Sequence, residues 1–181
     1  MLVGEAPGRH EEKINIPFFF FSGQELMKLI ESIGYSRSTV YITSVVRQRP
    51  YSIKKAIDKK TGEVIEKRPN RTPTKKEALA FAPLFDWELA QVKPKIIVTL
   101  GNTALQRLLG SQANIGKLHG QLLYEKIQRT NDAHDGYELT TDKHWIMPMY
   151  HPAAVLYARR LEPTIKADWQ QLGQDIKKMK K

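Results

Sequence analysis

Two short segments at opposite ends of the chain carry residues that could do chemistry. Near the start, the run GEAPG at residues 4–8 places Glu5 inside a turn rich in glycine and proline, and Glu11 and Glu12 follow it. Such a turn can point backbone N–H groups at a ligand, and these carboxylates could orient a water molecule or face a developing positive charge. Near the end, His151 stands before a proline, and its imidazole could donate to a developing negative charge. Together the segments predict a site that stabilises charges of both signs.

Each segment also has an ordinary structural interpretation. The turn at residues 4–8 could simply connect a strand to a helix, and it has neither the GxGxxG pattern nor the lysine of a phosphate-binding loop. A lone histidine is more often structural than catalytic. Both segments, however, directly follow predicted strands, and ligand sites of open α/β sheets lie at the carboxyl ends of strands. Their placement therefore favours a functional interpretation.

The hydrophobic pattern predicts the elements that would position these segments. Strands are expected at residues 1–3, 40–46, 95–100 and 145–150, and helices at 22–33, 74–92, 102–109 and from Thr164 onward. Capping boxes begin the first two helices, namely Ser22 with Glu25 and Thr74 with Glu77. Asn102 is a suitable cap for the third. The alternation predicts an α/β protein, a single three-layer α/β/α domain over residues 1–181 with a central, mostly parallel four-stranded sheet.

The charge balance indicates a polyanionic partner. Lys and Arg number 29 against 19 Asp and Glu, which gives a formal net charge of +10. A surplus of this size attracts nucleic acid, although a soluble basic protein with a lysine-rich tail would show it too. A polar, lysine-rich stretch at about residues 50–73 is predicted to be a basic loop or insertion, either a DNA clamp or a solvated loop.

The composition excludes several other classes of protein. The chain has no cysteine, which excludes disulfides, thiolate zinc sites and iron–sulfur clusters held by cysteine. The histidines outside the two segments lack the spacing of metal ligands, and no metal or other cofactor is expected. No stretch is apolar enough to span a bilayer or to act as a signal peptide. We therefore expect a cytoplasmic protein that does not engage membranes.

The order of motifs along the chain resembles that of the uracil-DNA glycosylase superfamily, in particular the family 4 enzymes of bacteria and archaea. The matching pieces are GEAPGxxE at residues 4–11, Pro17-Phe18, YITxVVxxRP at 41–50 and His-Pro-Ala at 151–153, with further similarity at 93–101 and 115–117. Many members of that family bind a 4Fe–4S cluster through four cysteines, which this chain lacks.

The resemblance implies a uracil-DNA glycosylase-like fold and the hydrolysis of uracil from single- or double-stranded DNA by base flipping, which leaves an abasic site in base-excision repair. It assigns catalytic roles to Glu5, Glu11 and His151, with His151 bonded to the base oxygen that gains charge. It assigns substrate binding to Gly4, Ala6, Pro7, Gly8, Phe18, Ser44 and Asn102, with Phe18 stacked on the flipped base. It assigns DNA binding to Arg49, Lys117, Pro152, Ala153, Leu156, Tyr157, Arg159 and Arg160. The expected enzyme is a monofunctional hydrolase that acts as a monomer without a cofactor.

Departures from the family leave alternatives open. Ser44 occupies the position of a family asparagine that recognises the pyrimidine edge, and a hydroxyl offers fewer hydrogen bonds than an amide. Phe20 replaces a glycine and either crowds the mouth of the pocket or packs elsewhere. The alternatives are a glycosylase for another base such as a deaminated purine, a catalytically weak DNA-binding member, and a nucleotide-binding regulator. Because the chain begins almost at its first motif, we also expect either an upstream segment or a shortened first strand.

Overall fold

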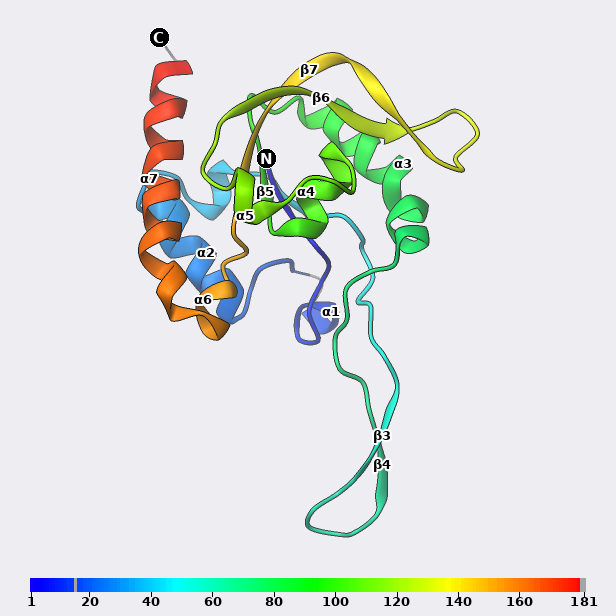
Figure 1. Cartoon of the computed structure of the whole chain (residues 1–181). Coiled ribbons are helices and arrows are strands. Elements are labelled where there is room, and N and C mark those ends of the chain that lie inside the picture. Colours follow the sequence, from blue (N-terminus) through cyan, green and yellow to red (C-terminus); the bar gives the residue numbers. More distant parts are fainter. Residues whose placement is uncertain (15, 180–181) are drawn as a thin grey trace.

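A five-stranded sheet forms the centre of the protein, whose computed structural model describes residues 1–14 and 16–179. In spatial order the strands are β2 (Ile42–Ser44), β1 (Leu2–Gly4), β5 (Ile97–Leu100), β7 (Tyr137–Met149) and β6 (Leu123–Thr130) (Figure 1). Neighbouring strands run parallel from β2 to β7, and β6 is antiparallel to β7. The predicted α/β class and the mostly parallel arrangement are confirmed, but the sheet has five strands rather than four.

The additional strand β6 and the first part of β7 form a hairpin with little apolar patterning. Ile127 is the buried residue of β6, and in β7 burial begins only at Ile146. The predicted strand at residues 145–150 corresponds to this buried end of β7. Because the prediction rested on apolar residues that face a core, it could not find the solvated part of the hairpin.

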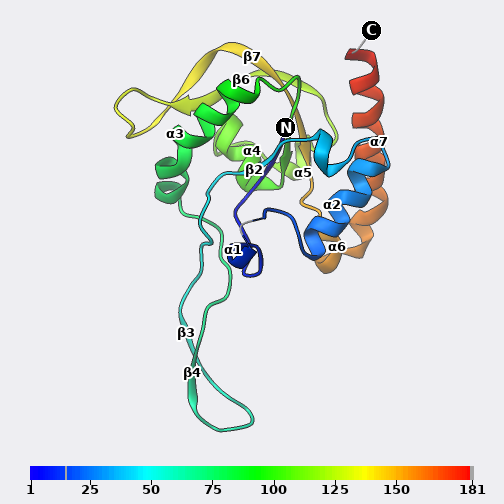
Figure 2. The same cartoon turned by 180° about the vertical axis from the view of Figure 1, so that it is seen from behind.

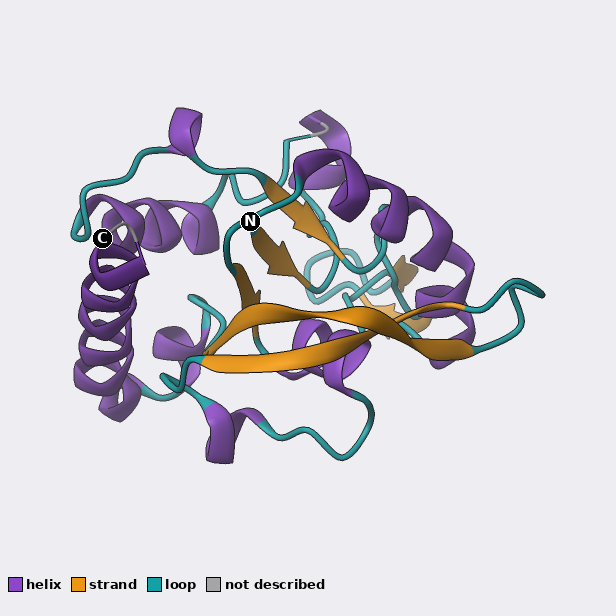
Figure 3. Cartoon of the chain, turned by 90° about the horizontal axis from the view of Figure 1, so that it is seen from above, coloured by secondary structure: helices purple, strands orange, loops and turns teal. Residues whose placement is uncertain are grey.

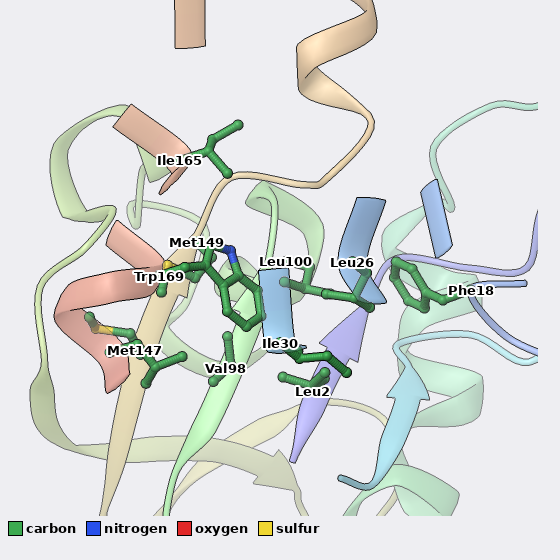
Figure 4. Close-up of a cluster of buried hydrophobic side chains, with 11 residues drawn as sticks. Leu2, Phe18, Leu26, Ile30, Val98, Leu100, Met147, Met149, Ile165 and Trp169 are labelled. Carbon is green, nitrogen blue, oxygen red and sulfur yellow. The ribbon is translucent and has the colours of Figure 1, made fainter. Parts of the chain in front are cut away.

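Helices cover both faces of the sheet. α2 (Phe21–Glu31) and α7 (Glu162–Met179) pack on one face, and α3 (Lys75–Val92) and α4 (Asn102–Leu109) pack on the other (Figure 3). Successive strand residues point to opposite faces, so Val98 joins the α2–α7 cluster while Ile97 joins the α3–α4 cluster. Figure 4 shows the α2–α7 cluster, in which Trp169 lies over the strand residues Val98 and Met147. This packing fixes the carboxyl ends of the parallel strands relative to one another.

Shorter elements complete the described chain. They are α1 (Glu11–Ile14), the 3₁₀ helix η1 (Arg37–Thr39), β3 (Lys54–Ile57), β4 (Val64–Lys67), α5 (Ile115–Leu118), α6 (Ala154–Tyr157) and the 3₁₀ helix η2 (Arg159–Leu161). β3 and β4 pair only with each other and form a hairpin that projects away from the body (Figure 2). The hairpin lies within the stretch predicted to be a basic loop or insertion. In the part of the chain that the structure describes, no helix is long and apolar enough to cross a membrane.

The N-termini of α2, α3 and α4 can be compared with the predicted caps. The box of Thr74 and Glu77 is confirmed, because the Glu77 N–H donates to Thr74 Oγ1 over 3.2 Å and the Thr74 N–H donates to the Glu77 carboxylate over 2.7 Å. The box at Ser22 is wrong, since α2 begins at Phe21 and makes no side-chain cap. Asn102 is not a cap of α4 either. It lies inside the helix, and its Oδ1 accepts from the Ile115 N–H over 2.9 Å, which fixes the start of α5.

A buried ion pair joins α4 to α3 and β6. The Arg107 side chain is 1% exposed, and its Nη2 lies 2.6 Å from Asp86 Oδ1. Its Nη1 donates to the carbonyl of Gln128 over 2.8 Å. The guanidinium also lies 5.1 Å from the ring centroid of Phe85 and 4.6 Å from that of Tyr137. Arg107 therefore connects α4 to α3 and β6, and Asp86 also accepts hydrogen bonds from the N–H and the hydroxyl of Thr130 on β6.

We expect the change Arg107→Ala to lower the free energy of unfolding by about 3 kcal/mol, because it leaves the Asp86 carboxylate without its cation. The matched control is Arg129→Ala. Arg129 pairs with Glu138, but the two side chains are 52% and 42% exposed, so its loss should cost less than about 1 kcal/mol. Urea denaturation of the wild type and the two variants measures both changes in the free energy of unfolding. Equal costs for the two changes would contradict this account of Arg107.

Candidate active site

A cavity of about 690 Å³ opens at the carboxyl ends of β1, β5 and β7. Its size is typical of sites for small ligands, which span ~300–1,000 Å³. The cavity brings together most of the predicted catalytic and substrate-binding residues: Glu5, Ala6, Pro7, Gly8, Glu11, Phe18, Asn102 and His151. Segments that are far apart in the sequence thus meet where parallel strands end, as the fold class requires.

His151 is held as a neutral hydrogen-bond donor. Burial lowers the pKa of its imidazole to about 4, so the ring is uncharged at neutral pH. Its Nδ1 lies 3.1 Å from the backbone N of Ala153, and an N–H can only donate. Nδ1 must therefore be the acceptor, which leaves the single proton of the neutral ring on Nε2. The chain itself selects the tautomer that offers an N–H from Nε2.

The ring of Phe18 packs beside this imidazole in the wall of the cavity. The two ring centroids lie 5.6 Å apart with an interplanar angle of 32°. The Phe18 ring rests directly on the end of β1, because a Cβ at Gly4 would lie 2.6 Å from the ring atoms Cε2 and Cζ. Only a residue without a side chain permits this approach, which gives Gly4 a role in shaping the cavity.

The backbone of Phe18 is held in an unusual conformation. Its φ is +52°, a region that non-glycine residues rarely occupy. Arg37 stabilises it, since Nη1 donates to the carbonyl of Phe18 over 3.0 Å and Nη2 donates to the carbonyl of Pro17 over 2.6 Å. The Phe18 carbonyl also packs against Gly23 so closely that a Cβ there would lie 1.9 Å away. Arg37 and Gly23 thus position the aromatic ring without touching the cavity.

The carboxylates divide into different roles. Glu5 lines the cavity and accepts a hydrogen bond from the hydroxyl of Thr103 at the start of α4. Glu11 accepts from the Gly8 N–H over 2.8 Å with one oxygen and from the Phe19 N–H over 3.2 Å with the other. Both Glu11 oxygens are therefore engaged by the backbone, which ties the turn at residues 4–8 to the Phe18 segment. Glu5 is the better placed of the two to orient a water molecule.

Two residues predicted at the site face elsewhere. Ser44 is 5% exposed, its hydroxyl donates to the carbonyl of Val46 over 2.8 Å, and it lies outside the lining of the cavity. The Arg49 side chain is 6% exposed and donates from Nε to Asn70 Oδ1 over 2.6 Å. Their hydrogen-bonding groups are thus used within the protein, and this geometry does not support base contact by Ser44 or phosphate contact by Arg49.

The segment after His151 presents a mixed surface beside the cavity. Leu156 and Tyr157 of α6 are 50% and 88% exposed, and Arg159 and Arg160 of η2 are exposed as well. Ala153 lines the cavity, and Lys117 on α5 is exposed. Pro152, in contrast, is buried and cannot reach a large ligand. Apart from Arg49 and Pro152, the members of this predicted DNA-binding group are at least partly accessible.

Several residues that line the cavity were not predicted from the sequence. Asn70, Arg71 and Thr72 reach it from the far end of the stretch predicted to be a loop. They do so because the ends of that stretch meet, with the Arg71 N–H donating to the carbonyl of Pro50 over 3.1 Å. Thr103, the partner of Glu5, follows Asn102 directly and could have been suspected from its neighbour. Among the described residues, no group of three or more His, Asp or Glu side chains is placed to hold a metal ion.

The fold and this cavity define an α/β protein whose candidate site lies at the carboxyl ends of parallel strands, and comparison with known proteins shows its family. The profile of the uracil DNA glycosylase superfamily matches residues 1–173. The type-4 uracil-DNA glycosylase of Saccharolobus solfataricus is 30% identical over 181 residues, which cover 97% of this chain and 70% of that protein. The type-4 uracil-DNA glycosylase of Archaeoglobus fulgidus is 30% identical over 174 residues, which cover 96% of this chain and 75% of that protein. The chain belongs to the uracil-DNA glycosylase superfamily, and the resemblance inferred from its motifs is confirmed.

The contact between Gly4 and Phe18 yields a stability test. Gly4→Ala should lower the free energy of unfolding by ~1–3 kcal/mol, because the new methyl group overlaps the Phe18 ring in a filled space. Gly8→Ala is the control, since a Cβ there would lie 3.4 Å from the nearest atom, the carboxylate oxygen Oε2 of Glu11. Chemical denaturation of both variants measures the difference. If Gly4→Ala proves as stable as Gly8→Ala, the ring does not rest on Gly4 in solution.

Proposed function

We propose that this protein hydrolyses the N-glycosidic bond of uracil in DNA and leaves an abasic site, the first step of base-excision repair. The observation that carries the proposal is the pair of Phe18 and His151, an aromatic ring and a neutral N–H donor that pack side by side in the wall of one cavity. Relatives named type-4 uracil-DNA glycosylases support the choice of base, since they match nearly the whole chain.

The cavity can supply what the bond cleavage needs. As the bond between C1′ of the sugar and the base nitrogen breaks, both electrons leave with the base, so the sugar becomes cationic and the base anionic. The N–H on Nε2 of His151 donates to the base oxygen that gains this charge, and one preorganised donor of this kind is worth ~3–4 kcal/mol. Glu5 orients the water whose oxygen bonds to C1′, and the water proton passes to the carboxylate or to solvent. No metal or cofactor enters these steps.

The same cavity can hold the base outside the duplex. Extruding a base from the stack costs a few kcal/mol, and stacking on an aromatic ring returns ~1–3 kcal/mol. Phe18 provides that ring. Leu156 and Tyr157 fill the gap left in the stack, because they project into solvent beside the cavity. Arg159 and Arg160, which follow on the same surface, contact the phosphates.

A second candidate is a glycosylase of the same mechanism with a different base preference. It is favoured by Ser44, whose hydroxyl donates to the Val46 carbonyl and does not line the cavity. A site without an edge-reading amide at this position discriminates less strongly between bases, because polar groups that pair with one base are what exclude another. Oligonucleotides carrying hypoxanthine or xanthine in place of uracil distinguish the candidates by which base is released.

The central test is His151→Ala on a labelled oligonucleotide with one uracil, followed by alkaline cleavage at abasic sites. We expect the wild type to give product and the variant to lose about 10²–10³ in the rate of excision, as for a lost oxyanion donor. DNA affinity should change little. His144→Ala on β7, outside the cavity, should retain activity. Intact DNA binding with no product on any of these bases would instead indicate a DNA-binding protein without turnover.

The pKa of His151 predicts how excision and stability depend on pH. Because the neutral ring is the active donor and its pKa is about 4, His151 should cause no loss of the single-turnover rate from pH 8 to about 5 and a loss near pH 4. The unfolded chain binds a proton at this residue below about pH 6.5. Between these values the unfolded state holds more protons, so stability must fall as the pH is lowered from about 6.5 to 4. His151→Ala should show a smaller fall in urea denaturation over that range, and an equal fall would show that the ring is not desolvated.

A further inference from the structure

We propose that the hairpin of residues 51–70, here called the basic arm, is a DNA-binding element that grips the phosphate backbone next to the flipped nucleotide. The inference rests on the proposed function in that DNA is taken as the substrate, and it names a contact surface that the chemistry itself does not require. It is carried by the register of the arm, its exposure, its charges and the attachment of its root to the catalytic cavity.

The basic arm is an antiparallel ribbon in a single register. Lys54 pairs with Lys67 and Ile57 with Val64, and the same register extends to a bridge between Tyr51 and Asn70. The arm turns tightly, because the Asp58 N–H donates to the carbonyl of Glu63 over 2.8 Å. A regular ribbon of this kind holds its side chains at fixed positions and is not a random surface loop.

The ribbon is not built to complete the core. It pairs with no other described strand and extends away from the body (Figure 1). Its apolar residues Ile57 and Val64 are 69% and 70% exposed. An isolated two-stranded ribbon is at best marginally stable in water, so the arm gains little from folding by itself. We infer that the arm is there to contact another molecule and not to stabilise the fold.

The charges on the arm suit a polyanion. An open groove of about 970 Å³ runs between the arm and α1, and it is lined by cations of both parts: Arg9, Lys13, Lys54, Lys55 and Lys67. None of these five makes an ion pair with a carboxylate in the described part of the chain. The acidic residues of the groove are compensated, since Glu66 pairs with Arg68 and Glu12 with Arg49. The free cations can therefore neutralise phosphates and release their counterions.

The root of the arm is part of the catalytic cavity. Pro50, Asn70 and Arg71 line the cavity, and Arg49 fixes Asn70 through its Nε. Arg71 is anchored in turn by paired bonds of 2.8 Å and 2.7 Å to the Glu77 carboxylate. A strand that lies in the groove would thus pass directly to the cavity that takes the base. The arm and the chemistry act on adjacent parts of one DNA chain.

Two variants test the arm. In the first, residues 54–67 are replaced by Asn-Gly between Ile53 and Arg68, which the shared register of the flanking pairs places opposite each other, because this dipeptide favours a two-residue hairpin turn. In the second, Lys54, Lys55 and Lys67 are changed together to Gln. The matched control changes Lys126, Lys143 and Lys177 to Gln, which removes the same charge from exposed positions on β6, β7 and α7. Binding is measured on a duplex oligonucleotide without uracil over a range of salt concentrations.

We expect both arm variants to bind the duplex roughly tenfold or more weakly, and the slope of log K against log salt to become less negative by about 2–3 in the triple-lysine variant. The control should keep the wild-type slope. Excision of uracil at saturating DNA should stay within about twofold of wild type, because the cavity residues and their anchors are unchanged. If the protein with the shortened arm fails to fold, the DNA affinity and salt dependence of the triple-lysine variant alone test the proposal.

The remaining outcomes separate this proposal from the proposed function. Wild-type affinity and slope in the arm variants, or an equal loss in the control, would overturn the arm as a DNA contact. Absence of DNA binding by the wild type would overturn it as well. Weakened binding in the arm variants without uracil excision by any protein would uphold the arm and reject the chemistry, since the binding measurement needs no turnover.

Discussion

The site depends on one strained residue, Phe18, whose ring lies on the end of β1. A non-glycine backbone with positive φ costs of order 1–3 kcal/mol and persists only where its surroundings determine it fully. Here the Phe18 ring packs against Gly4, and the Phe18 carbonyl packs against Gly23. Arg37 donates hydrogen bonds to the carbonyls of Pro17 and Phe18. Because these contacts come from β1, α2 and η1, the aromatic wall of the cavity is assembled only when the whole layer is folded.

The same packing sets the electrostatics of His151. The imidazole faces the Phe18 ring on one side, and Gly101 lies so close that a Cβ there would be 3.4 Å from the Cβ of His151. These apolar neighbours disfavour the charged ring and lower its pKa, while the Ala153 N–H determines which nitrogen keeps the proton. One arrangement thus shapes the cavity, keeps the donor neutral and orients it. A substitution that loosens the packing would change all of these properties together.

The sequence was sufficient for what periodicity and strand order determine. Parallel strands with apolar faces, such as residues 95–100, place the following loops at one edge of the sheet, and so the meeting of Glu5 and His151 could be expected. The place of Phe18 was implied only by the resemblance to the family. It was not sufficient for contacts that depend on exact side-chain direction. Ser44 ends β2 as predicted but donates its hydroxyl to the carbonyl of Val46, and Arg49 is buried and donates to Asn70. The Ser44 bond is made within two residues, but neither periodicity nor strand order indicates it, whereas Asn70 is brought to Arg49 by tertiary packing from 21 residues away.

The side chains of the basic arm are under different physical constraints from those of the core to which the arm is attached. The arm enters and leaves the fold at one point, where the Arg71 N–H meets the Pro50 carbonyl, so it lengthens the connection between β2 and α3 without disturbing the register of the sheet. Long insertions of this kind cost little stability, because the entropy of closing a loop rises only slowly with its length. The side chains of the arm are therefore free to be chosen for charge, whereas those around Phe18 are constrained by shape. Since Asn70 belongs to both arm and cavity and Arg71 follows it in the cavity lining, a contact made by the arm acts where the base must enter.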